Sequence, residues 1–230
     1  MQSVNSKHVL LFSVGVSIFG LCLALLLAFN PPPIHENLSW RKPLVGSVFG
    51  AVCVLGILAA LFPKQCSHSF HSETKNSRFT ANRIGLGSHH PDCQTFSAHI
   101  IRMNNHALCA ACTGLLLGAL IAIIGTALYF FGRLTFLNFG LPMVLIGIIG
   151  VALGFFQLKF RGVIRSVLNL VFVLAALMVL VGIDSLVESL LTDLLVLAFI
   201  VFWIFTRILL SQWDHWKICA NCESQCEVTV

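Results

Sequence analysis

The chain has 230 residues, of which 57% are hydrophobic and 10% are charged, and its formal net charge at pH 7 is +5. Soluble globular domains carry about 25% charged residues, so this composition excludes an ordinary water-soluble protein. The positive charge is small, and it gives no reason to expect nucleic-acid binding.

Long apolar runs follow one another along the chain. An α-helix needs about 20 apolar residues to cross the hydrocarbon core of a bilayer, and continuous runs favour helices over strands. We therefore predict an all-α fold, a polytopic membrane helical bundle of about six transmembrane helices. The predicted spans are residues 9–29, 44–62, 113–131, 139–158, 163–183 and 190–210.

These spans divide the chain into four predicted parts. Two N-terminal transmembrane helices occupy residues 1–62, and a cytoplasmic Cys/His-rich, metal-binding loop occupies 63–112. Four transmembrane helices follow over 113–211, and a cytoplasmic cysteine-rich tail occupies 212–230. The first apolar run is longer than the core of a usual signal peptide, so a first span is favoured over a cleaved leader.

The distribution of lysine and arginine predicts the orientation. With six spans, eleven of these residues lie on the side of the termini and the long loop, and three, Arg41, Lys42 and Arg133, lie on the other side. Cytoplasmic loops carry the excess of positive charge. We therefore expect a plasma-membrane protein whose N- and C-termini and long loop are cytoplasmic. Cytosolic thiols are kept reduced, so clustered cysteines there indicate metal binding or redox chemistry more than structural disulfides.

Two closely spaced ligand pairs stand before the third span. His90-x2-Cys93 is followed after fifteen residues by Cys109-x2-Cys112. This spacing is similar to that of zinc ribbons, with one histidine in place of a cysteine. His89 and His106 are competing ligands. The predicted cofactor is zinc, with iron-sulfur or copper as less favoured alternatives, because a tetrahedral and redox-silent ion suits mixed sulfur and nitrogen ligands.

A weaker group could form a second site or complete the first. It combines a cluster in the long loop with cysteines after the last span, and its residues are Cys66, His68, His71, Cys219, Cys222 and Cys226.

Polar residues within or beside the spans are also candidates. Asp184, Glu188 and Asp193 belong to the stretch DSLVESLLTD, which we predict to be a short external turn with Asp184 partly buried. Gln157 and Asn169 are expected to hydrogen-bond between helices. Small-xxx-small spacings predict close helix packing at Gly114, Gly118, Gly147, Gly150 and Gly154.

The run LCAACTG at 108–114, with His89 and Phe96 before it and Gly118 after it, resembles a family of small prokaryotic multi-pass membrane proteins, domain of unknown function 2085. DSLVE at 184–188 is similar to a later Asp-Gly-x-x-Gln segment of that family. The chain has Ser88 where the family has its first cysteine, and Ala111 where it has an arginine. The resemblance implies the membrane fold and the importance of the Cys/His loop, and it implies no activity.

These observations predict an integral membrane protein that binds a metal ion through its cytoplasmic loop, in a structural or sensory role. Its expected partners are the lipid bilayer and the metal ion. An enzyme is less favoured, but Cys112 lies at a helix N-terminus, where a thiolate is stabilised. A thiol-disulfide oxidoreductase that uses Cys109 and Cys112 is therefore one alternative. A metal-handling transporter with Asp184 on its path is the other.

Overall fold

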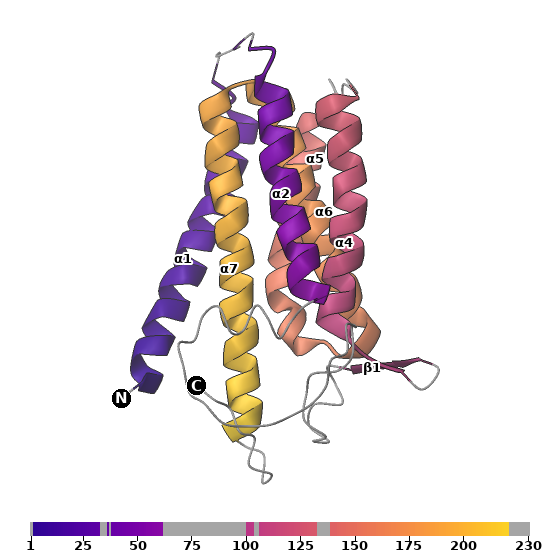
Figure 1. The fold of residues 1–230 in the computed structure, drawn as a ribbon. Coiled ribbons are helices and arrows are strands. Elements are labelled where there is room, and N and C mark those ends of the chain that lie inside the picture. Colours follow the sequence, from indigo (N-terminus) through magenta and orange to yellow (C-terminus); the bar gives the residue numbers. More distant parts are fainter. Residues whose placement is uncertain are drawn as a thin grey trace, which may run out of the picture.

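The computed structural model describes residues 2–32, 36, 38–61, 100–103, 106–132 and 139–220, with the side chains of 2–6, 100–103, 106–108, 215–216 and 218–220 left out. Over these ranges the chain is a helical bundle with one short hairpin (Figure 1). The helices are α1 (Gln2–Phe29), α2 (Arg41–Leu61), α4 (Ala110–Thr126), α5 (Gly140–Phe155), α6 (Gly162–Val187) and α7 (Leu190–Ala220). A π-helical segment, Ala127–Phe131, continues α4, and a 3-10 turn, Phe156–Lys159, follows α5.

Within the described ranges, six helices are long and apolar enough to cross a membrane, as the sequence predicts. Their outer faces carry large exposed hydrophobic side chains such as Leu11, Leu55 and Leu191. A surface of this kind suits contact with lipid. The start of α1, the end of α7 and the junction between α5 and α6 lie at the same end of the bundle (Figure 1). This arrangement agrees with an even number of crossings.

Helix α6 lies at the centre of the bundle, where it packs against α4 and α5. The predicted small-residue spacings permit this packing. A Cβ atom added at Gly114 would lie 2.0 Å from the carbonyl oxygen of Ser166, and one at Gly147 would lie 2.8 Å from that of Ala175. The helix backbones therefore approach each other too closely for any side chain larger than hydrogen at these two glycines.

The predicted loop 63–112 contains a hairpin and the start of a helix. Strand β1 (Ile100–Met103) pairs antiparallel with β2 (His106–Cys109), and α4 begins at Ala110, three residues before the predicted span. At the other end of the chain, α7 continues to Ala220, so the predicted tail 212–230 begins as helix. The predicted end of the loop and the predicted start of the tail both rest on the apolarity of the neighbouring spans. Helical hydrogen bonds do not depend on apolar side chains, and a helix can therefore extend beyond its membrane-embedded part.

Candidate metal centre

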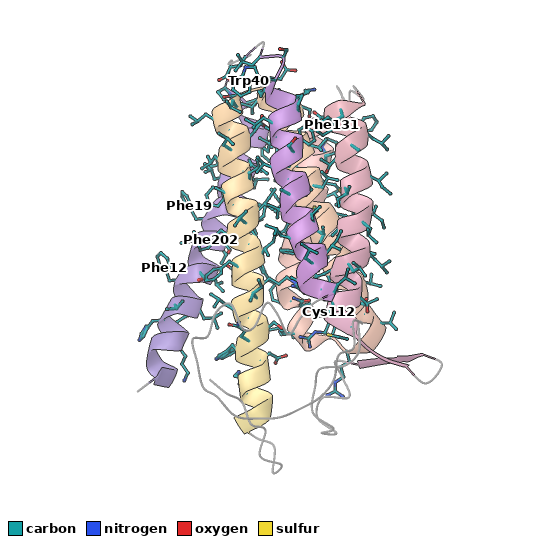
Figure 2. All side chains as sticks on the ribbon, viewed as in Figure 1. Phe12, Phe19, Trp40, Cys112, Phe131 and Phe202 are labelled. Carbon is teal, nitrogen blue, oxygen red and sulfur yellow. The ribbon has the colours of Figure 1, made fainter. Side chains whose placement is uncertain are left out.

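Cys109 and Cys112 stand where the hairpin becomes a helix. Cys109 is the last residue of β2 and the N-cap of α4, and Cys112 lies in the first turn of that helix. Cys109 is buried and Cys112 is half-buried, and their side chains are hydrogen-bonding neighbours. The Thr113 hydroxyl donates to the Cys109 carbonyl oxygen at 3.0 Å. Two adjacent thiols are thus held at the lower end of α4, where Figure 2 labels Cys112.

The register of the hairpin determines which part of the chain approaches this pair. Ile100 pairs with Cys109, and Met103 pairs with His106 next to the turn. Paired residues of antiparallel strands have Cα atoms about 4.5–5.5 Å apart. The residue at which β1 begins is therefore beside the first cysteine, and the long loop joins the hairpin next to the thiols.

Two arginines from neighbouring helices are buried at the same end of the bundle. Arg165 of α6 is 2% exposed and Arg207 of α7 is 5% exposed. Arg165 forms an ion pair with Asp214, with Nη1 and Oδ2 3.7 Å apart. The charges of Arg207 and Cys112 interact, as do those of Arg165 and Cys109. A guanidinium group therefore lies close enough to each sulfur to interact with it electrostatically.

Arg207 is held by amide side chains. Its Nη2 group donates to Asn169 Oδ1 and, at 3.5 Å, to Gln157 Oε1. Asn169 and Gln157 are buried, and their bonds to Arg207 of α7 confirm the predicted hydrogen bonds between helices. Among the residues with described side chains, no carboxylate forms an ion pair with Arg207.

Of the other predicted ligands, the structure describes only the backbone of His106 and Cys219. His106 opens β2 and Cys219 lies in the last turn of α7, and neither side chain is described. Within the described part of the chain there is no group of three or more His, Cys, Asp or Glu side chains that could hold a metal ion. The predicted metal ligands that lie outside the described residues are His89, His90, Cys93, Cys66, His68, His71, Cys222 and Cys226.

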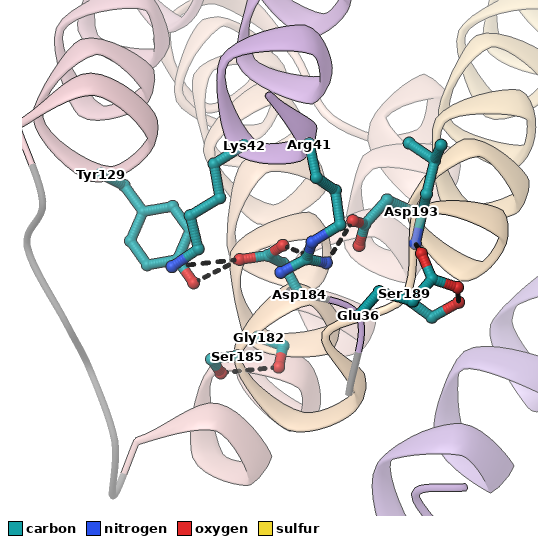
Figure 3. Close-up of polar contacts among 10 residues, drawn as sticks. Glu36, Arg41, Lys42, Tyr129, Gly182, Asp184, Ser185, Ser189 and Asp193 are labelled. Carbon is teal, nitrogen blue, oxygen red and sulfur yellow. Dashed lines mark hydrogen bonds and ion pairs between the residues drawn. The ribbon is translucent and has the colours of Figure 1, made fainter. Parts of the chain in front are cut away.

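A second polar cluster is buried at the opposite end of the bundle, where α6 ends and α7 begins, and Figure 3 shows its contacts. Arg41 Nη1 lies 2.8 Å from Asp184 Oδ1 and 2.6 Å from Asp193 Oδ2. The Tyr129 hydroxyl donates to Asp184 Oδ2 at 2.6 Å, and Lys42 Nζ lies 3.8 Å from the same oxygen. Both carboxylates are fully buried. Two aspartates are therefore neutralised by one buried arginine and one partly exposed lysine.

This cluster corrects the prediction of an external turn over 184–193. Helix α6 runs to Val187 and α7 starts at Leu190, so the turn consists of Glu188 and Ser189 alone. Asp184 and Asp193 are helical and have no exposed surface, because Arg41 of α2 supplies the charge that makes their burial tolerable. The Glu36 carboxylate accepts from Ser189 Oγ and from the Leu190 backbone N–H, which joins the first loop to this turn.

Sequence reasoning missed Arg41, Tyr129, Arg165 and Arg207 as site residues. Arg165 and Arg207 lie inside two predicted spans, 163–183 and 190–210, and belong to the eleven lysines and arginines on the side of the long loop. An arginine within an apolar span is costly and usually has a partner in the bundle. That signal identifies Arg165 and Arg207. No comparable signal marks Tyr129.

No protein-family model, curated protein or solved structure matches this chain. The resemblance to domain of unknown function 2085 therefore stays a prediction.

Proposed function

We propose that this chain is an integral membrane protein that binds one zinc ion through Cys109, Cys112 and the Cys/His loop that precedes them. The ion would fasten this loop to the helix bundle, in a structural or sensory role. His90 and Cys93 are the proposed partners of the thiol pair. His89 and His106 are the competing nitrogen ligands, and Cys66, His68, His71, Cys219, Cys222 and Cys226 form a second, weaker set.

The observation that carries this proposal is the pairing of Ile100 with Cys109. Cys93 precedes Ile100 by seven residues, and seven residues of chain can span up to about 25 Å. The chain between them is thus long enough for His90 and Cys93 to reach the sulfur atoms of Cys109 and Cys112. A zinc ion needs four such ligands in a tetrahedron, and structural sites fill all four positions with protein groups.

The charges around the thiols support the same proposal. Zinc carries two positive charges, so three thiolates and one neutral histidine leave a formal charge of minus one on the centre. The buried guanidinium groups of Arg165 and Arg207 lie at the same end of the bundle and favour such a charge. A thiol centre in a purely apolar surrounding would lack this stabilisation.

A thiol-disulfide oxidoreductase is the second candidate, because the Cys109 and Cys112 side chains are already hydrogen-bonding neighbours at a helix N-terminus. The two thiols would lose two electrons and two protons to a disulfide acceptor and form one disulfide bond. A metal-handling carrier has less support, since the Asp184 carboxylate is engaged by Arg41, Lys42 and Tyr129.

The proposed orientation places the thiol centre in the cytoplasm. Buried arginines carry no information about orientation. Arg165 and Arg207 are therefore removed from the eleven lysines and arginines on the side of the long loop, and Arg41 is removed from the three on the other side. Nine lysines and arginines then stand against two, and the excess remains on the side of the long loop. Cytoplasmic loops carry such an excess.

Metal analysis of the full chain, purified under reducing conditions, tests the proposal. We expect about one zinc per chain, and a loss of zinc in Cys109→Ser and Cys112→Ser because an incomplete ligand set binds weakly. Cys22→Ser and Cys53→Ser are matched controls, since these cysteines lie within the apolar parts of α1 and α2. Equal zinc content in all four variants would mean that the assignment is wrong.

A further inference from the structure

Arg207 has a charge that its own hydrogen bonds do not neutralise. The residue is 5% exposed and belongs to a membrane-spanning helix, where an isolated cation is expensive. Asn169 and Gln157 accept its hydrogen bonds, but amide oxygens carry no net charge. Buried arginines in the rest of the described chain have carboxylates. Arg41 has Asp184 and Asp193, and Arg165 has Asp214.

The position of Asn169 connects this guanidinium group to the thiols. A Cβ atom at Gly114 would lie 2.9 Å from Asn169 Cβ, so the first turns of α4 rest directly on this part of α6. Cys112 precedes Gly114 by two residues in the same helix. Asn169 therefore contacts the helix turn that carries Cys112, and it also accepts the hydrogen bond of Arg207.

We propose that Arg207 is the buried countercharge of the Cys109/Cys112 thiolate centre, and that Asn169 and Gln157 hold its guanidinium group in place. The inference rests on the proposed metal site. Arg207 is then a positioning residue that does not touch the metal, and it compensates the formal charge of minus one that three thiolates and a histidine leave on zinc. Residues in this role stabilise a metal site from outside the ligand set.

Zinc affinity of the full chain in detergent, measured by competition with a chromophoric chelator, tests this role. Arg207→Met removes the charge and keeps most of the side chain's length, and we expect it to weaken zinc binding about 10- to 100-fold. Arg207→Lys keeps the charge and should recover most of the affinity. Arg41→Met is the matched control, because it removes a buried arginine at the opposite end of the bundle, and its zinc affinity should stay within about threefold of the wild type.

The outcomes separate the two proposals. A wild-type chain without zinc would contradict the proposed function itself. A wild-type chain that binds zinc, with Arg207→Met equal to it, would overturn the role of Arg207 alone. Equal losses in Arg207→Met and Arg41→Met would also overturn that role, since they would indicate general destabilisation.

A double-mutant cycle gives a second measurement that does not depend on zinc affinity. Arg207→Met should lower the thermal unfolding temperature of the wild type. In a Cys109→Ser/Cys112→Ser background the guanidinium group has lost its anion, so the same substitution should leave that temperature unchanged or raise it. An equal decrease in both backgrounds, or failure of Arg207→Met to fold in both, would overturn the inference.

Discussion

Ile100 and Cys109 are paired residues at the end of the β1–β2 hairpin that lies away from its turn. This pairing brings the end of the long Cys/His loop next to a cysteine at the start of a helix that is long and apolar enough to cross a membrane. In the proposed zinc site, the part of the chain between Ile100 and Cys109 is thereby closed by backbone hydrogen bonds before any metal binds. A preformed closure of this kind lowers the conformational entropy that metal binding must overcome.

The reactivity of Cys109 and Cys112 should depend on the metal. Coordinated thiolates are occupied, so we expect alkylation of the native protein to be slow until a chelator is added. Mass spectrometry of the alkylated residues measures this. Rapid alkylation of both cysteines without chelator, in protein that contains no metal, would favour the oxidoreductase. The pair should then cycle between dithiol and disulfide with a defined reduction potential.

Close contact between α4 and α6 should be needed for the thiol centre. Gly114→Ala would place a Cβ atom 2.0 Å from the Ser166 carbonyl oxygen, so the helices must separate. We expect a loss of about 2 kcal/mol in the free energy of unfolding, together with weaker zinc binding. Gly50→Ala is the control, because no atom lies within 4 Å of the added carbon. It should change stability by less than about 1 kcal/mol, and a similar effect of both substitutions would contradict the packing argument.

The buried charge cluster at the other end should contribute to stability and leave zinc binding unchanged. Arg41→Met leaves two buried carboxylates with only Lys42 nearby, so we expect a loss of about 3–5 kcal/mol in the free energy of unfolding. Lys42→Met should cost less than about 1 kcal/mol, because that side chain is 36% exposed and its ion pair is longer. Denaturant titration in mixed micelles measures both. Equal losses would show that burial does not determine the strength of these ion pairs.

Reporter fusions test the orientation. Fusions after Phe131 and after Leu190 should report the external side, and fusions after Val230 and within residues 72–77 should report the cytoplasm. The opposite pattern would place the thiol pair in an oxidising compartment, where a disulfide between Cys109 and Cys112 becomes the favoured state.

Apolarity alone was enough to predict the six helices, because each one must be long and continuously apolar to cross a bilayer. It could not predict where α7 ends, since residues 211–220 remain helical outside the predicted span. Nor could it predict the hairpin, which depends on pairing between Ile100–Met103 and His106–Cys109 within a loop of mixed polarity.

The burial of Asp184 and Asp193 shows why the polar residues were harder to predict. Each looks like a turn residue when its neighbours in sequence are considered. Its partner, Arg41, is more than 140 residues away in the chain and meets the two carboxylates only through the packing of α2 against α7 and the end of α6. The CxxC spacing was recognisable because a chelating pair is local in sequence. Its position inside an apolar span marks Arg207 as well, but its hydrogen bonds to Asn169 and Gln157 depend on the packing of α7 against α6 and the turn after α5.

X-ray absorption at the zinc edge of the wild-type chain tests the central claim most directly. We predict a first shell of sulfur at about 2.3 Å and nitrogen at about 2.0–2.1 Å, as expected for three cysteines and one histidine. Cys109→Ser should lose one sulfur from this shell. A first shell of only oxygen and nitrogen, or a sulfur count unchanged in a Cys109→Ser/Cys112→Ser chain, would contradict the assignment of these two cysteines as metal ligands.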